Sequence, residues 1–133
     1  MSVLKSQRSE SSIKFLDNAY DLEVHTIKCA MKLPKRMTFF VSTSLVELAA
    51  SVHSHCKAAN SIYPTNAHEA QMRRDHFIEA NAALQGLISK VSLLHEFEHG
   101  LSVHAIEHWT DLMLDQARLI SGAKKSDSER FKF

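Results

Sequence analysis

The stretches Met31-Lys32-Leu33-Pro34-Lys35-Arg36 and Ala58-Ala59-Asn60-Ser61-Ile62-Tyr63-Pro64-Thr65-Asn66 hold the two prolines of this 133-residue chain. A proline lacks the amide hydrogen of a helical hydrogen bond and its ring clashes with the preceding turn, so each proline is expected to separate two helices. Outside these stretches, apolar residues recur every three or four positions, which is the spacing of one helical face. The chain has only 3 glycines, and we predict an all-α fold.

Four amphipathic helices are expected, with approximate bounds 13–33, 36–60, 66–100 and 102–122. We expect Ser11 or Ser12 to cap the first helix, because a serine hydroxyl accepts a hydrogen bond from a free amide at a helix start. Asn66, with Glu69 three residues later, is a variant of the capping box. Gly100 is expected to end the third helix or the loop after it, and Gly122 to end the fourth helix.

The apolar stripe of each helix predicts the core. In the first helix it is Ile13, Leu16, Tyr20, Val24, Ile27 and Met31. In the second it is Phe40 or Val41, Leu45, Leu48, Val52, Cys56 and Ala59. In the third it is Phe77, Ala80 or Asn81, Leu84, Leu87 or Ile88, Val91 and Leu94, with Gly86 marking a close helix contact. In the fourth it is Val103, Ile106, Trp109 or Thr110, Met113, Ala117 and Ile120.

Short connections between long helices favour antiparallel neighbours, so we predict an up-down-up-down antiparallel four-helix bundle forming a single domain. Residues 1–12 are expected to be a flexible polar N-terminal arm, 13–122 the bundle, and 123–133 a polar basic C-terminal tail. No apolar run has the length needed to cross a membrane. Cys29 and Cys56 lack CxxC spacing and fall within apolar patterns, so we expect reduced core thiols in a cytoplasmic protein.

The net charge of +1 is close to neutral, so binding to nucleic acid would depend on a local basic patch. In the predicted bundle, the N-terminal arm, the second connection and the C-terminal tail share one end. The basic residues expected at that end are Lys5, Arg8, Arg73, Arg74, Lys124, Lys125 and Arg130, while Lys32, Lys35 and Arg36 lie at the other. The alternative is a solvated, salt-bridged surface, because several acidic residues are close by.

The aromatic residues are assigned mainly to core positions, with Phe131 and Phe133 as the exception. These two alternate with Arg130 and Lys132 near the C-terminus. Aromatic rings next to basic side chains are typical of surfaces that contact a partner or stack on nucleic-acid bases.

The second expected helix is unusually poor in charge. Between Met37 and Cys56, Glu47 is the only formally charged residue. A helix of this kind is usually covered on two sides, and in a short chain the second covering is most simply another copy of the same chain. We predict a homo-oligomer with Phe39, Val46 and Ala50 in the interface.

The segment His95-Glu96-Phe97-Glu98-His99 matches the H-E-x-x-H pattern of zinc peptidases, in which two histidines on one helical face bind the metal. Gly100 follows at once, which places the pattern at a helix end, and a chain with 9 histidines contains such pairs by chance. We therefore predict no catalytic residue, no metal and no cofactor. A zinc-dependent hydrolase is kept as a remote alternative.

The chain resembles the Avd-like family of four-helix-bundle proteins. Avd is the accessory variability determinant of diversity-generating retroelements, and related proteins are encoded in ribosomal-RNA intervening sequences. The resemblance extends from Ser9 to Arg130. Its main motifs are Leu33-Pro34-Lys35-Arg36, Ala58-Ala59-Asn60-Ser61-Ile62-Tyr63-Pro64, Ala105-Ile106-Glu107-His108-Trp109 and Lys124-Lys125-Ser126-Asp127-Ser128-Glu129-Arg130-Phe131.

The resemblance implies a homopentamer that binds RNA or DNA and a reverse transcriptase, and that assists RNA-templated cDNA synthesis. The matching basic positions are Lys35, Arg36, Arg73, Arg74, Lys124 and Lys125. With 16 basic and 15 acidic residues, the chain is less basic than is usual in the family. The alternative function is a structural interaction protein of the same fold without a nucleic-acid role.

Overall fold

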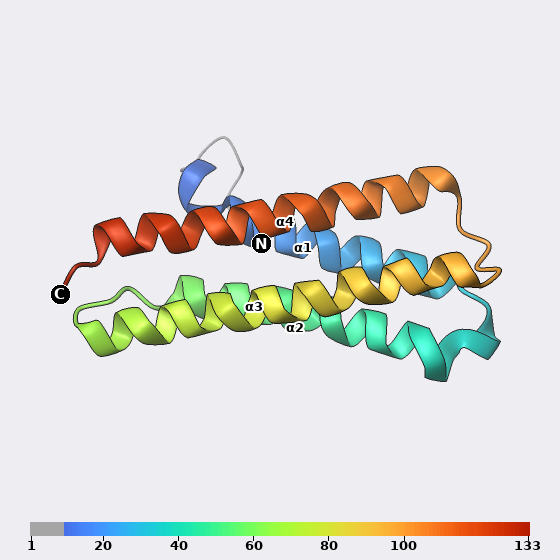
Figure 1. Ribbon diagram of the computed structural model, residues 1–133, viewed down its shortest axis with the longest axis horizontal. Coiled ribbons are helices and arrows are strands. Elements are labelled where there is room, and N and C mark those ends of the chain that lie inside the picture. Colours follow the sequence, from blue (N-terminus) through green and yellow to red (C-terminus); the bar gives the residue numbers. More distant parts are fainter. Residues whose placement is uncertain (1–9) are drawn as a thin grey trace.

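A computed structural model describes residues 10–133 of the chain. Its elements are α1 (Glu10–Lys32), the 3₁₀ turn η2 (Lys35–Met37), the π-helical turn η3 (Thr38–Ser42), α2 (Thr43–Ser61), α3 (Ala67–Leu93), the 3₁₀ turn η4 (Leu94–Glu96) and α4 (Val103–Arg130). The four long helices lie side by side, and the described part of the chain contains no strand (Figure 1). The prediction of an all-α, four-helix protein is confirmed.

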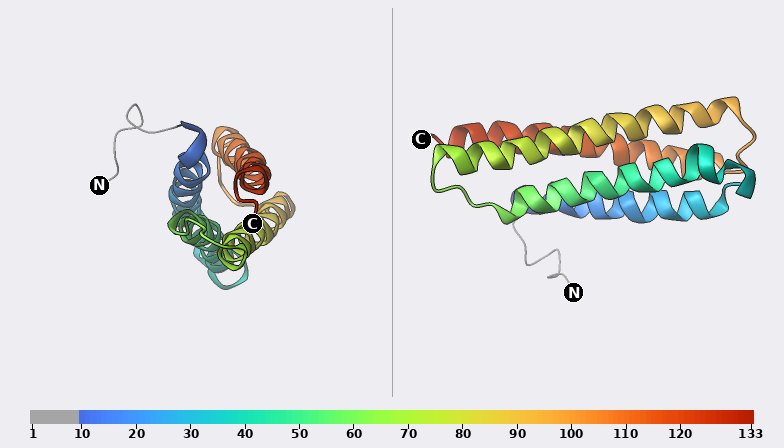
Figure 2. Two further views of the ribbon diagram at one scale, coloured as in Figure 1. Left: turned by 90° about the vertical axis from the view of Figure 1, so that its left-hand side faces the viewer. Right: turned by 90° about the horizontal axis from the view of Figure 1, so that it is seen from below.

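Each long helix packs mainly against two others. Helices α1 and α3 both contact α2 and both contact α4. Seen along the long axis, the four helices surround a shared centre (Figure 2). The connections α1–α2 and α3–α4 lie at one end, called here the Pro34 end (Figure 1). The α2–α3 connection and the C-terminus lie at the other, called here the C-terminal end.

Local signals in the sequence set most of the helix boundaries. Helix α1 ends at Lys32, just before Pro34, and Pro64 lies between α2 and α3. Asn66 Oδ1 accepts a hydrogen bond from the Glu69 amide at 2.9 Å, and the Glu69 carboxylate accepts one from the Thr65 amide at 2.7 Å. These bonds confirm the predicted cap of α3.

The start of α4 also follows its sequence signals. Ser102 Oγ accepts a hydrogen bond from the Ala105 amide at 3.1 Å, as a helix cap does. Gly100 precedes this cap with φ of 74°, a conformation that glycine adopts without steric cost. Both residues lie where the sequence predicts a break between helices.

Three boundary predictions are wrong. Ser11 and Ser12 lie inside α1, which begins at Glu10, so neither caps it. The second helix does not start as a regular α-helix at Arg36 but passes through η2 and η3 first. Gly122 does not end α4, which continues to Arg130. A glycine costs about 1 kcal/mol in a helix, and the good helix formers that follow it outweigh this cost.

Residues 123–130 of the predicted C-terminal tail are therefore helical and belong to α4. Of the predicted N-terminal arm, residues 1–9, with Lys5 and Arg8, lie outside the described residues.

The core face of α1 differs from the predicted stripe. The buried residues are Phe15, Ala19, Leu22, Thr26 and Cys29. By contrast, Tyr20 is 58% exposed, Ile27 38% and Met31 79%. Helix α1 carries two overlapping apolar stripes, and a polar threonine interrupts the one that is buried.

Thr26 is accommodated in the core because its hydroxyl is fully used. It donates a hydrogen bond to the Leu22 carbonyl at 2.7 Å and accepts one from Trp109 Nε1 at 2.9 Å. Gln116 of α4 is also buried, and its amide donates to the Phe15 carbonyl at 2.9 Å. Buried polar groups that have hydrogen-bond partners lower the folding stability little, and their bonds favour a single packing arrangement of the helices.

The other stripes agree better with the structure. Helix α3 buries Phe77, Ala80, Leu84, Leu87 and Val91, with Leu94 following in η4. The second segment buries Val41, Leu45, Val52, Cys56 and Ala59, with Leu48 partly buried. Helix α4 buries Trp109, Leu112, Met113 and Ile120. Val103 is 74% exposed, so its assignment to the core is wrong.

Both cysteines are free and buried, as predicted. Burial raises the pKa of the Cys56 thiol to about 12, which keeps it protonated at neutral pH. Among the helices of residues 10–133, none combines the length and the apolar character that crossing a membrane requires.

Gly86 and Gly122 occupy opposite environments. A Cβ atom added to Gly86 would lie 3.1 Å from Leu48 Cδ2, which confirms the predicted close contact between α3 and α2. A Cβ atom added to Gly122 would meet nothing within 4 Å. Only the first glycine therefore lies against a side chain of another helix.

We expect Gly122→Ala to stabilise the protein by about 0.5–1 kcal/mol, because alanine has the higher helix propensity and loses less backbone entropy on folding. Urea denaturation followed by circular dichroism measures the change. Gly86→Ala is the matched control, and its gain should be smaller because the new methyl group crowds Leu48. A lower unfolding free energy for Gly122→Ala would show that α4 does not extend past this position.

Candidate nucleic-acid interface

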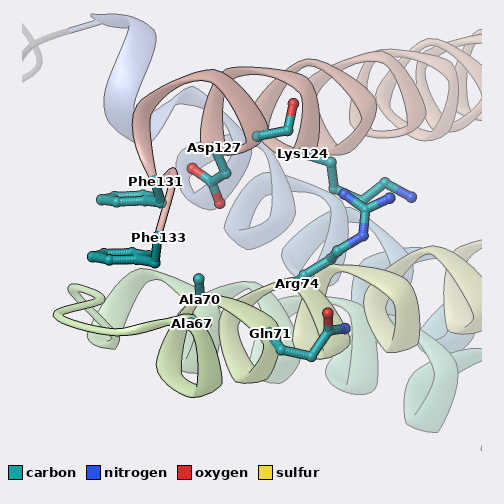
Figure 3. Close-up of a pocket in the computed structure, with 9 residues that line it drawn as sticks. Ala67, Ala70, Gln71, Arg74, Lys124, Asp127, Phe131 and Phe133 are labelled. Atoms are coloured by element: carbon teal, nitrogen blue, oxygen red, sulfur yellow. The ribbon is translucent and has the colours of Figure 1, made fainter.

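The C-terminal end brings together basic residues from two helices that are distant in sequence. Arg73 and Arg74 lie in the second turn of α3, and Lys124, Lys125 and Arg130 lie in the last turns of α4. Because the start of α3 lies beside the end of α4, the two sets lie at the same end of the bundle, and Figure 3 shows Arg74 of the first set facing Lys124 of the second. The five side chains have different environments.

Arg73 is buried, with 7% of its surface exposed. Its Nε donates to Asp127 Oδ2 at 2.6 Å, and its Nη1 donates to the carbonyl oxygens of Ala59 at 2.8 Å and Ile62 at 3.1 Å. The guanidinium also lies 5.3 Å from the centre of the Phe77 ring. Arg73 therefore joins the end of α2 to α3 and α4, and its prediction as a nucleic-acid contact is corrected to a structural role.

Arg130 is exposed but shares the same carboxylate. Its Nη2 lies 3.1 Å from Asp127 Oδ1, and its guanidinium lies 4.7 Å from the centre of the Phe131 ring. Asp127 thus pairs with two arginines at once. The sequence suggested that Asp127 would dilute the basic patch, but its charge is already compensated within the fold.

Arg74 and Lys124 face an open cavity of about 280 Å³ between α3 and α4. Figure 3 shows the two side chains extending toward each other from the two helices. Within residues 10–133, neither forms an ion pair or a hydrogen bond. The cavity wall consists of Ala67, Ala70, Gln71, Arg74, Lys124, Asp127, Ser128, Phe131 and Phe133.

Two phenylalanines form the opposite part of the cavity wall. Phe131 is half-buried and packs edge-on against Tyr63, with ring centres 5.7 Å apart. Phe133 is 65% exposed. Figure 3 shows both rings on the side of the cavity away from Arg74 and Lys124. The cavity therefore combines two uncompensated cations with an aromatic wall, which suits an anion that carries a flat apolar group.

Lys125 is exposed but does not line this cavity. Lys35 and Arg36 are exposed at the Pro34 end, where Arg36 Nη2 lies 3.5 Å from the Glu98 carbonyl oxygen. The fold of a single chain thus brings Arg74 and Lys124 together. Lys35 and Arg36 lie at the opposite end of the bundle. The sequence analysis missed Gln71, whose position in the cavity wall depends on the packing of α3 against α4.

The His95–His99 segment lacks the geometry of a zinc peptidase. His95 and Glu96 lie in η4, and Phe97 has an extended backbone. His99 Nδ1 accepts a hydrogen bond from the Leu101 amide at 3.0 Å. The two histidines therefore do not share a helical face, and residues 10–133 contain no group of three side chains able to hold a metal ion.

Several histidines of the bundle have partners on neighbouring helices. His53 Nδ1 lies 2.7 Å from a Glu23 carboxylate oxygen on α1, while His55 Nδ1 lies 3.1 Å from His76 Nδ1 on α3. His53 and His55 thus face different helices, α1 and α3, from the two sides of α2. Burial lowers the pKa of His25, against the opposing effect of its hydrogen bond to the Ala105 carbonyl.

The predicted oligomer face is partly uncovered. Phe39 is 91% exposed and its neighbour Phe40 77%, while Val46 and Ala50 are half-buried. Helix α2 packs against both α1 and α3, which accounts for part of its low charge within a single chain. The two phenylalanines lie in the π-helical turn η3, and this packing does not cover them.

Comparisons with protein-family models, with curated proteins and with solved structures give no match to this chain.

Proposed function

We propose that this protein is a non-enzymatic accessory protein that binds nucleic acid at its C-terminal end and holds it beside a reverse transcriptase, as the resemblance to the Avd-like family implies. Its architecture in this proposal is a single-domain, up-down-up-down antiparallel bundle. The observation that carries the proposal is the cavity where Arg74 and Lys124 converge without a compensating carboxylate. Uncompensated arginine and lysine side chains are the usual ligands of phosphate groups.

Two cations per chain give a weak site, because affinity for nucleic acid grows with the number of phosphates that are neutralised. Self-association multiplies this affinity, since linked copies bind one strand together. We therefore include the homopentamer in the proposal, with Phe39, Val46 and Ala50 in its interface. An oligomer of this kind binds nucleic acid despite a net charge of +1 per chain.

In this proposal the two ends of the bundle bind different partners. The C-terminal end holds RNA or cDNA, and Lys35 and Arg36 at the Pro34 end remain available to the reverse transcriptase. A second candidate function is a structural interaction protein that does not bind nucleic acid. The apolar side chains exposed around the Pro34 end, such as Met31, Phe39 and Phe40, favour it because a protein partner can cover them.

A double charge reversal tests the nucleic-acid proposal. We expect Arg74→Glu with Lys124→Glu to abolish binding of labelled single-stranded RNA and DNA in fluorescence anisotropy, because the cavity then repels phosphate. Wild-type affinity should fall as salt rises, since bound phosphates release their counterions. Circular dichroism checks that the variant remains folded.

Lys28→Glu with Lys57→Glu is the matched control. It changes the net charge by the same amount at exposed positions on α1 and α2. Equal losses in the two variants would assign binding to overall charge instead of the cavity. A wild-type protein that binds neither strand at low salt would favour the structural interaction protein.

A further inference from the structure

We infer that the cavity between the start of α3 and the end of α4 holds one unpaired base together with its phosphate, so that the protein selects single-stranded over double-stranded nucleic acid. The inference rests on the proposed function and names the ligand of the same site. It is carried by the aromatic wall of the cavity, which phosphate binding alone does not require.

The aromatic wall has a fixed part and an exposed part. Phe131 is held by the edge-on contact with Tyr63 and by the guanidinium groups of Arg73 and Arg130, which lie 5.8 Å and 4.7 Å from its ring centre. Phe133 lies on the same side of the cavity and is 65% exposed (Figure 3). An exposed phenylalanine beside uncompensated cations is a stacking platform of the kind that single-strand binding proteins use.

The charged wall places a phosphate close to a stacked base. Arg74 and Lys124 lie across the cavity from Phe131 and Phe133, so one ligand contacts both walls (Figure 3). Asp127, the only acidic side chain among the residues that line the cavity, pairs with Arg73 and Arg130, which compensates its charge. A flat apolar group joined to an anion by a short linker is the chemistry of a nucleotide.

Selection for single strands follows from the position of the rings. In a duplex, both faces of each base are covered by neighbouring base pairs, and turning a base out costs a few kcal/mol. An unpaired base reaches Phe133 without that cost. Any base can stack, because every base has an aromatic face, so we expect little sequence preference.

Phe133→Ala tests the inference in the full-length protein, with labelled dT₁₀, rU₁₀ and a ten-base-pair DNA duplex as probes. We expect single-strand affinity to fall about 5- to 150-fold, the effect of losing one stacked base, and duplex affinity to change less than about twofold. Phe133→Tyr keeps the ring and should retain wild-type affinity. Phe97→Ala is the control, since Phe97 is 56% exposed at the opposite end.

The outcomes separate this inference from the function on which it rests. Unchanged single-strand affinity in Phe133→Ala, with binding still abolished by Arg74→Glu and Lys124→Glu, overturns the base pocket and leaves the proposed function standing. If Phe133→Ala loses the same affinity for the single strands and for the duplex, the base pocket is also overturned. A loss of affinity for dT₁₀ and rU₁₀, without a loss for the duplex, supports the inference. The single strand that the wild-type protein binds more tightly identifies DNA or RNA as the ligand.

Discussion

Replacing Arg73 by alanine should lower the free energy of unfolding by about 3 kcal/mol, the lower end of the usual cost of removing one partner of a buried ion pair, because Asp127 keeps Arg130 as a partner. The substitution removes the bond to Asp127 and the bonds to the carbonyl oxygens of Ala59 and Ile62, of which the Ala59 oxygen keeps the Ile62 amide as a donor at 3.2 Å. It also removes the side chain that joins α2, α3 and α4 at the C-terminal end. A loss of this size is a large fraction of the stability of a typical domain.

Urea unfolding measures this loss, and Arg74→Ala is the natural control because Arg74 is the next residue and is exposed. Its expected effect is within about 0.5 kcal/mol, as for most surface substitutions. Arg73→Lys should restore little, since an ammonium group cannot reproduce the planar fork that reaches a carboxylate and two carbonyl oxygens. If Arg73→Ala and Arg74→Ala cost the same, the buried role of Arg73 would be wrong.

The difference between the buried Arg73 and the exposed Arg74 affects the interpretation of binding experiments. A variant that removes both arginines would lose nucleic-acid affinity through unfolding as well as through lost charge. Binding should therefore be tested with Arg74 and Lys124 variants that keep Arg73. The apolar stripe of α3, extended back by one turn from Phe77, reaches Arg73 and not Arg74, so the sequence does contain a signal that separates the two arginines.

Local signals explain why much of the fold was predictable. Pro34 and Pro64 restrict the backbone, Gly100 permits a positive φ, and Asn66 and Ser102 accept hydrogen bonds at the starts of their helices. None of these features depends on distant parts of the chain. The core face of α3 was predictable for a similar reason, because its apolar stripe has no strong competitor.

Most of the errors occur where residues far apart in the sequence determine which side chains are buried or paired. Helix α1 has two possible core faces, and the buried one contains Thr26, whose partner Trp109 lies on another helix. The end of α4 was placed too early for a local reason, because the good helix formers after Gly122 outweigh the cost of one glycine. At the site, the sequence placed basic residues at one end, but it did not show that Asp127 pairs with Arg73 and Arg130.

The predicted oligomer is tested by Phe39→Asp with Phe40→Asp, which we expect to convert a pentamer into a monomer of 15.0 kDa. Aromatic residues at the centre of an interface commonly contribute 2 kcal/mol or more each, and a buried carboxylate adds a further cost. Light scattering at micromolar concentration gives the mass. Leu114→Asp is the control, because Leu114 is 55% exposed on α4, and α4 packs mainly against α1 and α3.

The same variant links assembly to binding. Arg74 and Lys124 lie at the opposite end of the bundle from Phe39 and Phe40, so each cavity remains intact in the monomer. Single-strand affinity should nevertheless fall by about 100-fold or more, because linked sites no longer act on one strand. A monomeric wild-type protein would contradict the oligomer directly. A monomeric variant with wild-type affinity would instead show that one cavity is sufficient for binding, and that self-association serves another purpose.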